Sequence, residues 1–390
     1  MKFADRLALM RVVRPYLAGV SLRYQWRLFH AFRTEGLTRH QGRLWIHSYL
    51  PPIPSPAFDR LYRIALSSKR VPYQVYMAIS ANCPYHCSFC SYGRRHNEQL
   101  STTQTLDIIA QLRAMGTAIF GITGGEPLLR PDLPQIIAAA APDMSTILFT
   151  SGYGLEKAKA QTLQDHGLEC VAVGIEAASP QAHDAIRGVQ GSFEQAITAL
   201  RACSEVGIYT AVSTIATRQK IASGELDRLY DLASRHHVHE LRVLSPIATG
   251  CSAGNQDFML GSVDLAWVRQ FHIHKNLRMN GPVVSSTALI ESPQMFGCTA
   301  GYHHCYIDAA GNVCPCDLTP LSFGNLTKTS LQDIWEEMGR LFPQPRSRCL
   351  MSQIAASIDK DNLPLSSEES HHLIPDSKGE PLPYLYRLLR

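Results

Sequence analysis

Six short apolar runs, each followed by a helical pattern, constrain the fold of this chain more than any other feature. The runs are Tyr73–Ser80, Ala118–Thr123, Ser145–Thr150, Cys170–Ile175, Tyr209–Ile215 and Glu240–Leu244. Helices are predicted between and after them, near residues 104–115, 132–141, 155–166, 192–206 and 224–236. Repeated strand–helix units predict a parallel sheet, because parallel neighbours need a crossover connection. The pattern alone does not separate an open sheet from a barrel.

The totals are those of an ordinary globular protein with room for one large domain. The chain has 390 residues, enough for an α/β domain of about 200–250 residues with smaller attachments. It has no run of about 18 uncharged apolar residues, the length of a membrane span, and its first residues do not resemble a secretory signal. Seven of the eleven cysteines lie in two clusters with metal-like spacing. Such clustering favours a reducing compartment, so we predict a cytoplasmic protein.

The first 70 residues carry much of the positive charge. They contain thirteen Lys and Arg against three Asp and Glu, whereas the whole chain has a net charge of only +4. Residues 2–34 have the apolar spacing of an amphipathic helix. Residues 50–56 contain four prolines and predict an extended linker, which Ala57–Ser67 follows as a second helix. The basic helix either packs on the core with its arginines in solvent or contacts an anionic partner such as a membrane surface.

A loop directly after the first predicted strand concentrates three thiols. Cys83, Cys87 and Cys90 follow one another at spacings of four and three, and Phe89 precedes the last of them. Three thiolates from one short loop suit a [4Fe-4S] cluster, whose fourth iron then has no protein ligand. A structural zinc knuckle is the alternative, but it requires four ligands and prefers Cys-x2-Cys pairs. A disulfide framework fits the spacing less well than either.

The loop Cys-x3-Cys-x-Phe-Cys after a strand resembles the signature of the radical S-adenosylmethionine (radical SAM) enzymes. The resemblance implies a partial (β/α)6 barrel of the TIM type, with a [4Fe-4S] cluster on Cys83, Cys87 and Cys90. It implies that SAM binds the open iron through its amino and carboxylate groups. It also implies reductive cleavage of SAM to a 5′-deoxyadenosyl radical, which abstracts hydrogen from the substrate. In such folds the chemistry lies at the carboxyl ends of the strands.

The ends of the following strands carry the residues that the resemblance assigns to the cofactor. Gly124-Gly125-Glu126-Pro127 resembles the family's Gly-Gly-Glu-Pro motif, which holds the amino group of SAM, and Thr150-Ser151-Gly152 stands where relatives carry Thr-Asn-Gly. Glu176 stands where relatives direct a polar group to ribose or substrate. Arg187 is expected either to pair with the SAM carboxylate or to form a structural ion pair. The predicted cofactor-binding residues are Gly124, Gly125, Glu126, Pro127, Thr150, Ser151, Glu176, Arg187 and Ser213, and the predicted catalytic residues are Cys83, Cys87, Cys90 and Glu176.

A second cysteine-rich unit follows the predicted barrel. Cys298, Gly311 and Cys316 form a Cys-x12-Gly-x4-Cys pattern, which resembles the start of the SPASM or twitch extension of radical SAM enzymes. That resemblance implies an auxiliary [4Fe-4S] cluster presented by a β-hairpin, and a turn near residues 308–312 independently predicts the hairpin. A helix is predicted at residues 331–340. The full extension has more cysteines than this chain offers beyond Cys316.

We therefore predict at most one auxiliary cluster. Its predicted ligands are Cys298, Cys316 and Cys349, with Cys305 or Cys314 as the fourth. Structural zinc at the same thiols is the alternative.

These patterns divide the chain into four parts and favour one class of function. The parts are a basic helical segment with a proline-rich linker (1–70), the radical SAM core (71–280), a SPASM/twitch-like region (281–350) and an irregular tail (351–390). We expect hydrogen abstraction in peptide or natural-product maturation, or alternatively in a membrane lipid or other anionic small molecule. A non-catalytic metal-binding scaffold with a basic arm is the alternative from another class.

The expected partners follow from this chemistry. They are an electron donor such as flavodoxin or ferredoxin and the substrate itself, with no nucleic acid. A peripheral contact with the inner face of the membrane through residues 1–34 is a further hypothesis.

Overall fold

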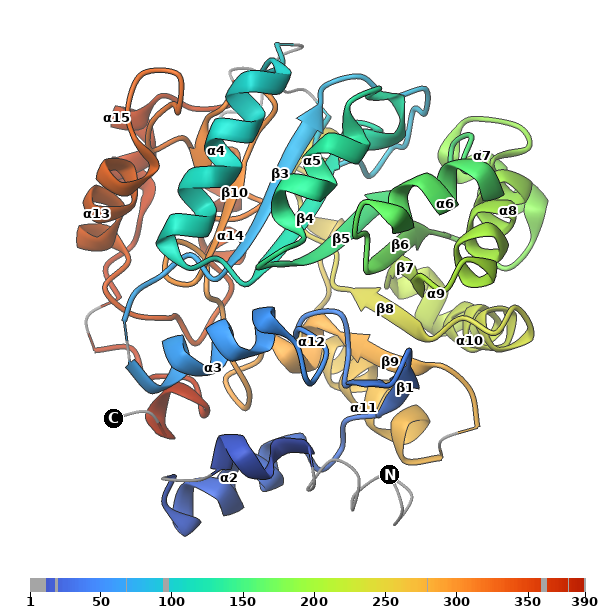
Figure 1. Ribbon diagram of the computed structural model, residues 1–390, viewed down its shortest axis with the longest axis horizontal. Helices are drawn as coiled ribbons and strands as arrows, with labels where there is room; N and C mark the ends of the chain where they lie inside the picture. The colour runs from blue at the N-terminus through green and yellow to red at the C-terminus, as the bar shows by residue number, and fades with distance from the viewer. Residues whose placement is uncertain are drawn as a thin grey trace.

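One large sheet organises the computed structural model, which describes residues 12–17, 20–67, 69–93, 98–278, 280–358, 363–377 and 379–388. Its strand order is β11-β10-β3-β4-β5-β6-β7-β8-β9, and every neighbouring pair except β10 with β11 is parallel. The central strands are β3 (Gln74–Ser80), β4 (Ile119–Gly124), β5 (Ser145–Thr150), β6 (Cys170–Gly174), β7 (Tyr209–Ile215) and β8 (Glu240–Leu244) (Figure 1). They confirm the six predicted strands and the α/β class.

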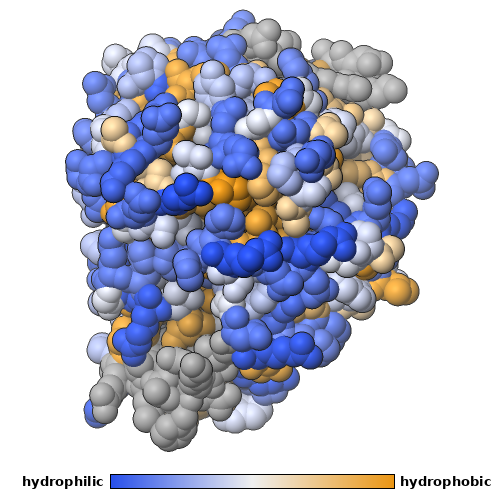
Figure 2. Space-filling model, turned by 90° about the vertical axis from the view of Figure 1, so that its right-hand side faces the viewer, coloured by the Kyte–Doolittle hydropathy of each residue, from blue (hydrophilic) through white to orange (hydrophobic). Residues whose placement is uncertain are grey.

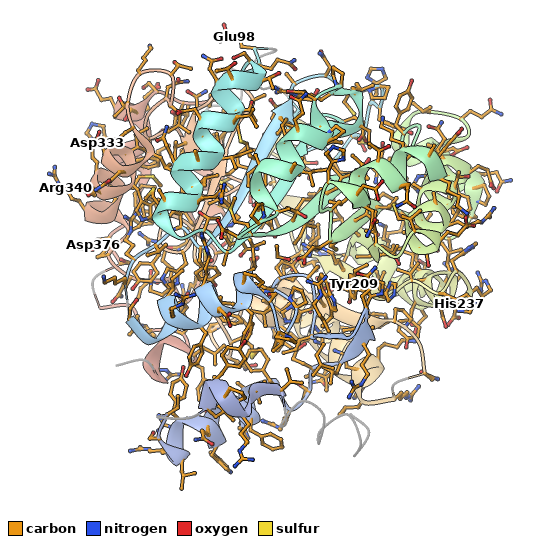
Figure 3. The ribbon with its side chains drawn as sticks, in the orientation of Figure 1. Glu98, Tyr209, His237, Asp333, Arg340 and Asp376 are labelled. Carbon is orange, nitrogen blue, oxygen red and sulfur yellow. The ribbon has the colours of Figure 1, made fainter. Side chains whose placement is uncertain are left out.

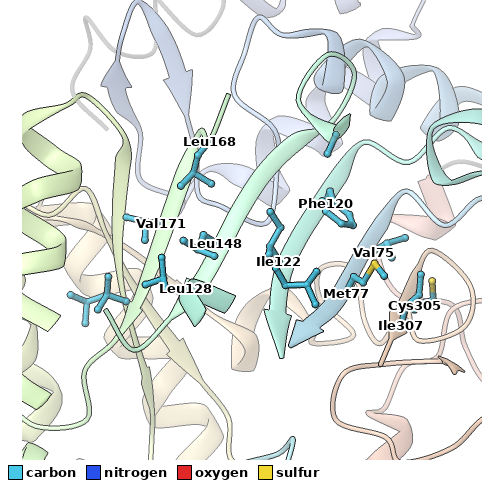
Figure 4. Packing of buried hydrophobic residues seen from close by; sticks show 14 of the residues in the cluster. Val75, Met77, Phe120, Ile122, Leu128, Leu148, Leu168, Val171, Cys305 and Ile307 are labelled. Atoms are coloured by element: carbon cyan, nitrogen blue, oxygen red, sulfur yellow. The ribbon is translucent and has the colours of Figure 1, made fainter. Parts of the chain in front are cut away.

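Helices cover the outer face of this sheet between successive strands. They are α4 (Thr102–Met115), α5 (Leu133–Ala140), α6 (Lys157–Asp165), α7 (Pro180–Arg187), α8 (Ser192–Glu205), α9 (Arg218–Ser223), α10 (Glu225–Arg235) and α11 (Ser262–Arg278). Fully buried side chains such as Val75, Met77 and Ile122 form the core beneath them (Figure 4). Tyr76 and Ala78 of the same strand belong to a second cluster inside the barrel, because successive side chains of a strand point to opposite faces.

The sheet extends beyond the six predicted strands at both edges. Strand β9 (Val283–Ser286) pairs with β8, and α12 (Thr287–Ile290) follows it. The predicted hairpin exists as β10 (His304–Ile307) and β11 (Val313–Cys314), and β10 pairs with β3 in parallel. Residues 283–314 thus contribute strands to the sheet that carries the barrel. The boundaries proposed at residues 70, 280 and 350 stay predictions.

The segment before the barrel differs from the predicted linker. It forms a hairpin of β1 (Thr38–His40) and β2 (Arg43–Trp45), and the proline-rich stretch packs beside it. Pro51, Pro52 and Ile53 are buried. The amide of Ile53 donates to the carbonyl of Leu44 at 2.9 Å, and the carbonyl of Ile53 accepts from the amide of Leu44 at 2.8 Å. Residues 51–55 form no helix, as the prolines predicted, and burial of Pro51, Pro52 and Ile53 removes their apolar surface from water. Helix α3 (Pro56–Ser67) follows as predicted.

The hairpin closes the end of the barrel at which the strands begin. Trp45 stacks on Tyr209, the first residue of β7, with ring centroids 4.2 Å apart. The backbone amide of Ser48 donates to the Glu240 carboxylate, at the start of β8, at 2.8 Å. Tyr209 accordingly lies inside the molecule, whereas His237 lies at its periphery (Figure 3). The hairpin does not cover the opposite end of the barrel, where the strands finish.

Helix α2 (Leu22–Phe32) and the segment around Leu385 pack near each other beside the barrel. Residues 12–17 and α2 (Leu22–Phe32) are helical, in agreement with the predicted amphipathic helix, and the part of that prediction that falls on residues 1–11 and 18–19 lies outside the described residues. Helix α2 packs through Phe32 on Phe296, with ring centroids 6.2 Å apart. Leu385 of the C-terminal segment is buried in the same cluster. No helix among the described residues is long and apolar enough to cross a bilayer.

The described part of the tail predicted as irregular contains two α-helices, besides two short 3-10 helices at Ala355–Ser357 and Tyr386–Leu388. The α-helices are α14 (Leu350–Ile354) and α15 (Ser367–Leu373). A reciprocal capping box between Ser366 and Glu369 starts α15, which explains how a short polar sequence forms a helix. Helix α13 (Leu331–Leu341) agrees with its prediction and packs on Arg70, whose guanidinium lies 3.9 Å from the Trp335 ring centroid. On the face shown in Figure 2, hydrophilic residues predominate around smaller apolar patches.

Candidate active site

One cavity of about 650 Å³ opens at the carboxyl ends of the parallel strands, and both cysteine groups line it. The first group is Cys83, Cys87 and Cys90, which follow β3. The second group is Cys298, Cys316 and Cys349, from the chain beyond β9. The remaining predicted residues that line the cavity are Gly124, Gly125, Glu126, Thr150, Ser151, Glu176, Arg187 and Ser213. Pro127 is not among the lining residues; it is buried at the start of the short turn Pro127–Leu129.

The loop of the first cysteine group is held by backbone contacts. The carbonyl of Cys90 accepts from the amides of Gly93 and Cys251, at 3.3 and 2.9 Å. Gly250 has a φ of +56°, and a Cβ there would overlap the Cys90 carbonyl. Only glycine therefore allows the loop that contains Gly250 and Cys251 to approach Cys90. Burial raises the pKa of the Cys90 thiol. A bound cation would offset this burial and favour the thiolate.

Gly124 and Gly125 allow the chain before the cysteine loop to cross the end of β4. A Cβ on Gly124 would overlap the carbonyl of Ser80, and one on Gly125 would overlap that of Asn82. The amide of Gly125 donates to the Ser80 carbonyl, and that of Glu126 to the Asn82 carbonyl, both at 2.7 Å. The two glycines thus allow protein backbone to approach closely, and these contacts fix where the cysteine loop begins.

The Glu126 carboxylate joins the ends of two predicted motifs. It is 1% exposed and accepts from the Thr150 hydroxyl at 2.7 Å and from the Ser151 amide at 2.9 Å. It also accepts from the Ser151 hydroxyl and from the Leu128 amide. Four donors fill the lone pairs of one carboxylate. The structure therefore brings Glu126, Thr150 and Ser151 together, as the two motifs suggested, and makes them one hydrogen-bonded unit.

Glu176 lies in a buried ion-pair network. Lys220 Nζ is 2.6 Å from its Oε2, and Arg187 Nη2 is 3.5 Å from its Oε1. Burial opposes ionisation of this carboxyl, but Lys220 and then Arg187 outweigh it, and they hold the pKa of Glu176 below its ordinary value. Sequence reasoning missed Lys220. Its only signal was its place on the helix after the fifth predicted strand.

Arg187 connects this network to the cysteine loop. Its Nη1 lies 3.5 Å from Cys87 Sγ, and its Nε is buried without a hydrogen-bond partner among the described residues. A Cβ on Gly174, at the end of β6, would overlap the guanidinium. Gly174 therefore leaves the space that Arg187 occupies. Ser213 pairs with Gly174 on the neighbouring strand and also lines the cavity.

Arg242 lies deeper in the barrel, on β8. It is 2% exposed, and its guanidinium lies 4.1 Å from the Tyr49 ring centroid and 5.1 Å from that of Phe149. It also donates to the Ser48 hydroxyl. The hairpin that closes the barrel thus helps to hold a cation at the bottom of the cavity.

The second cysteine group gathers on the wall of the cavity formed after β9. A hydrogen bond between the thiols of Cys298 and Cys349 lowers the pKa of Cys298, and Cys316 lines the same cavity. Cys305 and Cys314 are not brought to this wall. Cys305 lies in the outer core beside Met77 and Ile307 (Figure 4), and Cys314 is buried in the cluster inside the barrel.

Comparison with protein families agrees with this geometry. Residues 77–231 match the model of the radical SAM superfamily, and residues 298–349 match that of SPASM, an iron-sulfur cluster-binding domain. These two domains imply a [4Fe-4S] cluster, SAM and an auxiliary iron-sulfur cluster.

Individual proteins show the same similarity. The chain is 25% identical over 302 residues to the PqqA peptide cyclase of Rhizobium meliloti, covering 74% of this chain and 80% of the relative. It is 24% identical over 292 residues to the AdoMet-dependent heme synthase of Nitratidesulfovibrio vulgaris, covering 69% and 79%. The structure of Streptococcus suis SuiB bound to precursor peptide SuiA superposes with a TM-score of 0.57 at 16% identity, covering 71% of this chain and 67% of SuiB. The chain belongs to the radical SAM superfamily of enzymes and carries a SPASM domain.

Proposed function

We propose that this protein is a peptide-modifying radical SAM enzyme whose [4Fe-4S] cluster is bound by Cys83, Cys87 and Cys90. The observation that carries the proposal is that three thiols of one loop and a second group of three thiols line a single cavity. When bound by the first group, such a cluster supplies the electron that splits SAM into methionine and a 5′-deoxyadenosyl radical, which abstracts hydrogen from the substrate. A flavodoxin or ferredoxin is the proposed electron donor.

The protein's own part in this reaction is to bind and orient. Arg187 has a buried Nε without a described partner and lies 3.5 Å from Cys87 Sγ, so it is placed to bind a carboxylate of SAM beside the cluster. Glu176 pairs with Arg187 and neutralises part of its charge, and Lys220 holds Glu176 in place. Glu126 ties the ends of β4 and β5 together under the cysteine loop. These groups keep the reacting atoms in register and limit access of water.

Two comparisons support a peptide substrate. One relative is a peptide cyclase, and one solved structure of the same fold holds a precursor peptide. We therefore place the reaction in the maturation of a peptide.

Anaerobic turnover tests the two levels of this proposal separately. Reconstituted protein should release 5′-deoxyadenosine from SAM and a reductant, and Cys87→Ala should abolish the release. Incubation with a small peptide encoded beside the gene should then change the mass of that peptide. Release of 5′-deoxyadenosine without any change in peptide mass would contradict the peptide substrate and leave SAM cleavage intact. No release from fully iron-loaded protein would contradict both.

A second proposal concerns α2 and an anionic membrane surface. Leu22, Trp26 and Phe29 lie along one side of α2 and are 81%, 64% and 50% exposed. Another side of the helix packs on the body through Phe32. Spacing of four and three puts the exposed residues in one stripe, and Arg23 and Arg27 lie on the same helix. An exposed apolar stripe among arginines is the pattern of a helix that lies in a membrane interface.

Liposome pelleting tests this contact. We expect the protein to pellet with vesicles that contain phosphatidylserine and to pellet less with phosphatidylcholine alone. Replacing Leu22, Trp26 and Phe29 with Ser should reduce pelleting several-fold. Val263→Ser is the matched control, because Val263 is 80% exposed on a different helix. Equal pelleting of the triple variant and the control would exclude a role of this stripe.

A further inference from the structure

The auxiliary site has three thiols but needs a fourth ligand. Cys298, Cys316 and Cys349 line the cavity, whereas a closed iron-sulfur site takes four protein ligands. Cys305 of β10 is fully buried in the outer core. Its neighbour His304 lines the cavity instead. Because side chains alternate along β10, Cys305 and His304 cannot reach the same side of the sheet.

His304 is held by a carboxylate from the same unit. Its Nε2 lies 3.1 Å from Asp317 Oδ1, and its side chain is 9% exposed. Its Nδ1 is buried without a hydrogen-bond partner among the described residues. One ligand atom each of His304, Cys316 and Asp317 lies within 4.8 Å of the other two. The imidazole is therefore fixed next to a cysteine of the auxiliary group.

This arrangement has the form that metal-bound histidines take in proteins. A ligating histidine commonly donates the hydrogen of its second nitrogen to a carboxylate, which fixes the tautomer and frees the other nitrogen as a ligand. When Nε2 of His304 donates its hydrogen to Asp317, the lone pair of Nδ1 is available to bind a metal. Leaving a buried polar group without a partner is unfavourable, because its hydrogen bonds to water are lost and not replaced. A bond from Nδ1 to a metal would remove that cost.

We propose that His304 is the fourth ligand of the auxiliary iron-sulfur cluster, beside Cys298, Cys316 and Cys349. Asp317 orients the imidazole and does not itself bind iron. The cluster then has three thiolates and one neutral imidazole, so its net charge is one unit less negative than with four thiolates. Replacing thiolate by imidazole raises the reduction potential of an iron-sulfur cluster. The auxiliary cluster would therefore accept an electron more readily than an all-cysteine one.

Pulsed EPR on the full-length protein tests the ligand without any substrate. Replacing Cys83, Cys87 and Cys90 with Ala leaves only the auxiliary cluster to reconstitute and reduce. We expect a ¹⁴N hyperfine coupling typical of a directly bound imidazole, which changes to ¹⁵N when the protein is grown with labelled histidine. His304→Cys, made in this background, should keep the iron, lose the nitrogen coupling and lower the reduction potential.

Matched variants separate a ligand from a structural residue. Asp317→Asn should keep the nitrogen coupling with a changed magnitude, and Cys305→Ala and Cys314→Ala should leave iron content and spectrum unchanged. The proposal is overturned by absence of nitrogen coupling, by unchanged spectra in His304→Cys, by loss of the cluster in Cys305→Ala or Cys314→Ala, or by zinc in place of iron. None of these measurements depends on SAM cleavage, so failure here is distinct from failure of the proposed function.

Discussion

Replacing Lys220 with Met tests how the site holds its buried carboxylate. The substitution keeps the apolar stem of the side chain and removes the charge that lies 2.6 Å from Glu176. The two side chains are 10% and 5% exposed. Removing one member of a buried ion pair costs about 3–5 kcal/mol, because the other charge stays buried. Arg187 at 3.5 Å and the Ile215 amide at 3.3 Å remain, so we expect a loss near the lower end, about 3 kcal/mol.

Urea unfolding of anaerobically reconstituted protein measures this loss as a shift of the midpoint at constant slope. Two further variants calibrate it. Lys157→Met breaks the ion pair with Glu205, in which the Lys157 side chain is 69% exposed and the Glu205 side chain 45% exposed. This variant should cost less than about 1 kcal/mol. The double variant Lys220→Met with Glu176→Gln removes both charges and should be more stable than the sum of the two single losses indicates.

The pH dependence of the stability loss in Lys220→Met is an independent test of the same reasoning. In the native protein the pKa of Glu176 is lowered, so its contribution to stability is present above the unfolded pKa of about 4.3 and is lost as the pH falls through the lower folded pKa. Replacing Lys220 removes the largest charge that lowers that pKa, so the pKa of Glu176 should rise from its native value. The deficit of Lys220→Met should therefore be largest at pH 8 and shrink toward pH 5, as the carboxyl takes up a proton. A deficit below about 1 kcal/mol, or one that grows on acidification, would refute this reasoning.

Three further substitutions test other parts of the structure. Trp45→Ala removes the ring stacked on Tyr209 and should lower the unfolding free energy by about 3–5 kcal/mol in the same urea titration. Trp26→Ala, at an exposed position, should cost less than about 1 kcal/mol. Equal losses would contradict the closing role of the hairpin. Gly174→Ala places a Cβ against the Arg187 guanidinium and should weaken SAM binding in equilibrium dialysis by about tenfold, roughly 1.4 kcal/mol. Gly261→Ala is the control, because a Cβ fits at that open position. Unchanged SAM affinity of Gly174→Ala would contradict the proposed binding of SAM by Arg187. Cys298→Ala should remove only the auxiliary iron, about half of the total if both sites carry four irons, and full iron content would contradict the assignment.

Local patterns in the sequence were sufficient for the strands and helices of the parallel sheet and for the first cysteine group. The apolar period of each strand and helix is a property of consecutive residues, so β5, β7 and β8 were predicted with their observed bounds. Cys83, Cys87 and Cys90 lie within one loop, and their spacing alone was enough to suggest a metal centre. Glu126 and Ser151 were suggested separately by two motifs, but their hydrogen bond was not.

What only the tertiary structure decided are contacts between residues far apart in the chain. Lys220 reaches Glu176 across 44 positions, and the amide of Ser48 reaches Glu240 across 192. No local periodicity marks such partners, because burial of charge and closure of a barrel depend on how elements pack. The register of β10 beside β3 likewise turned His304 toward the cavity and Cys305 away from it. The spacing of cysteines thus indicated a second cluster, but only strand pairing showed which side chains face the cavity, since a shift of one residue in a strand reverses its faces.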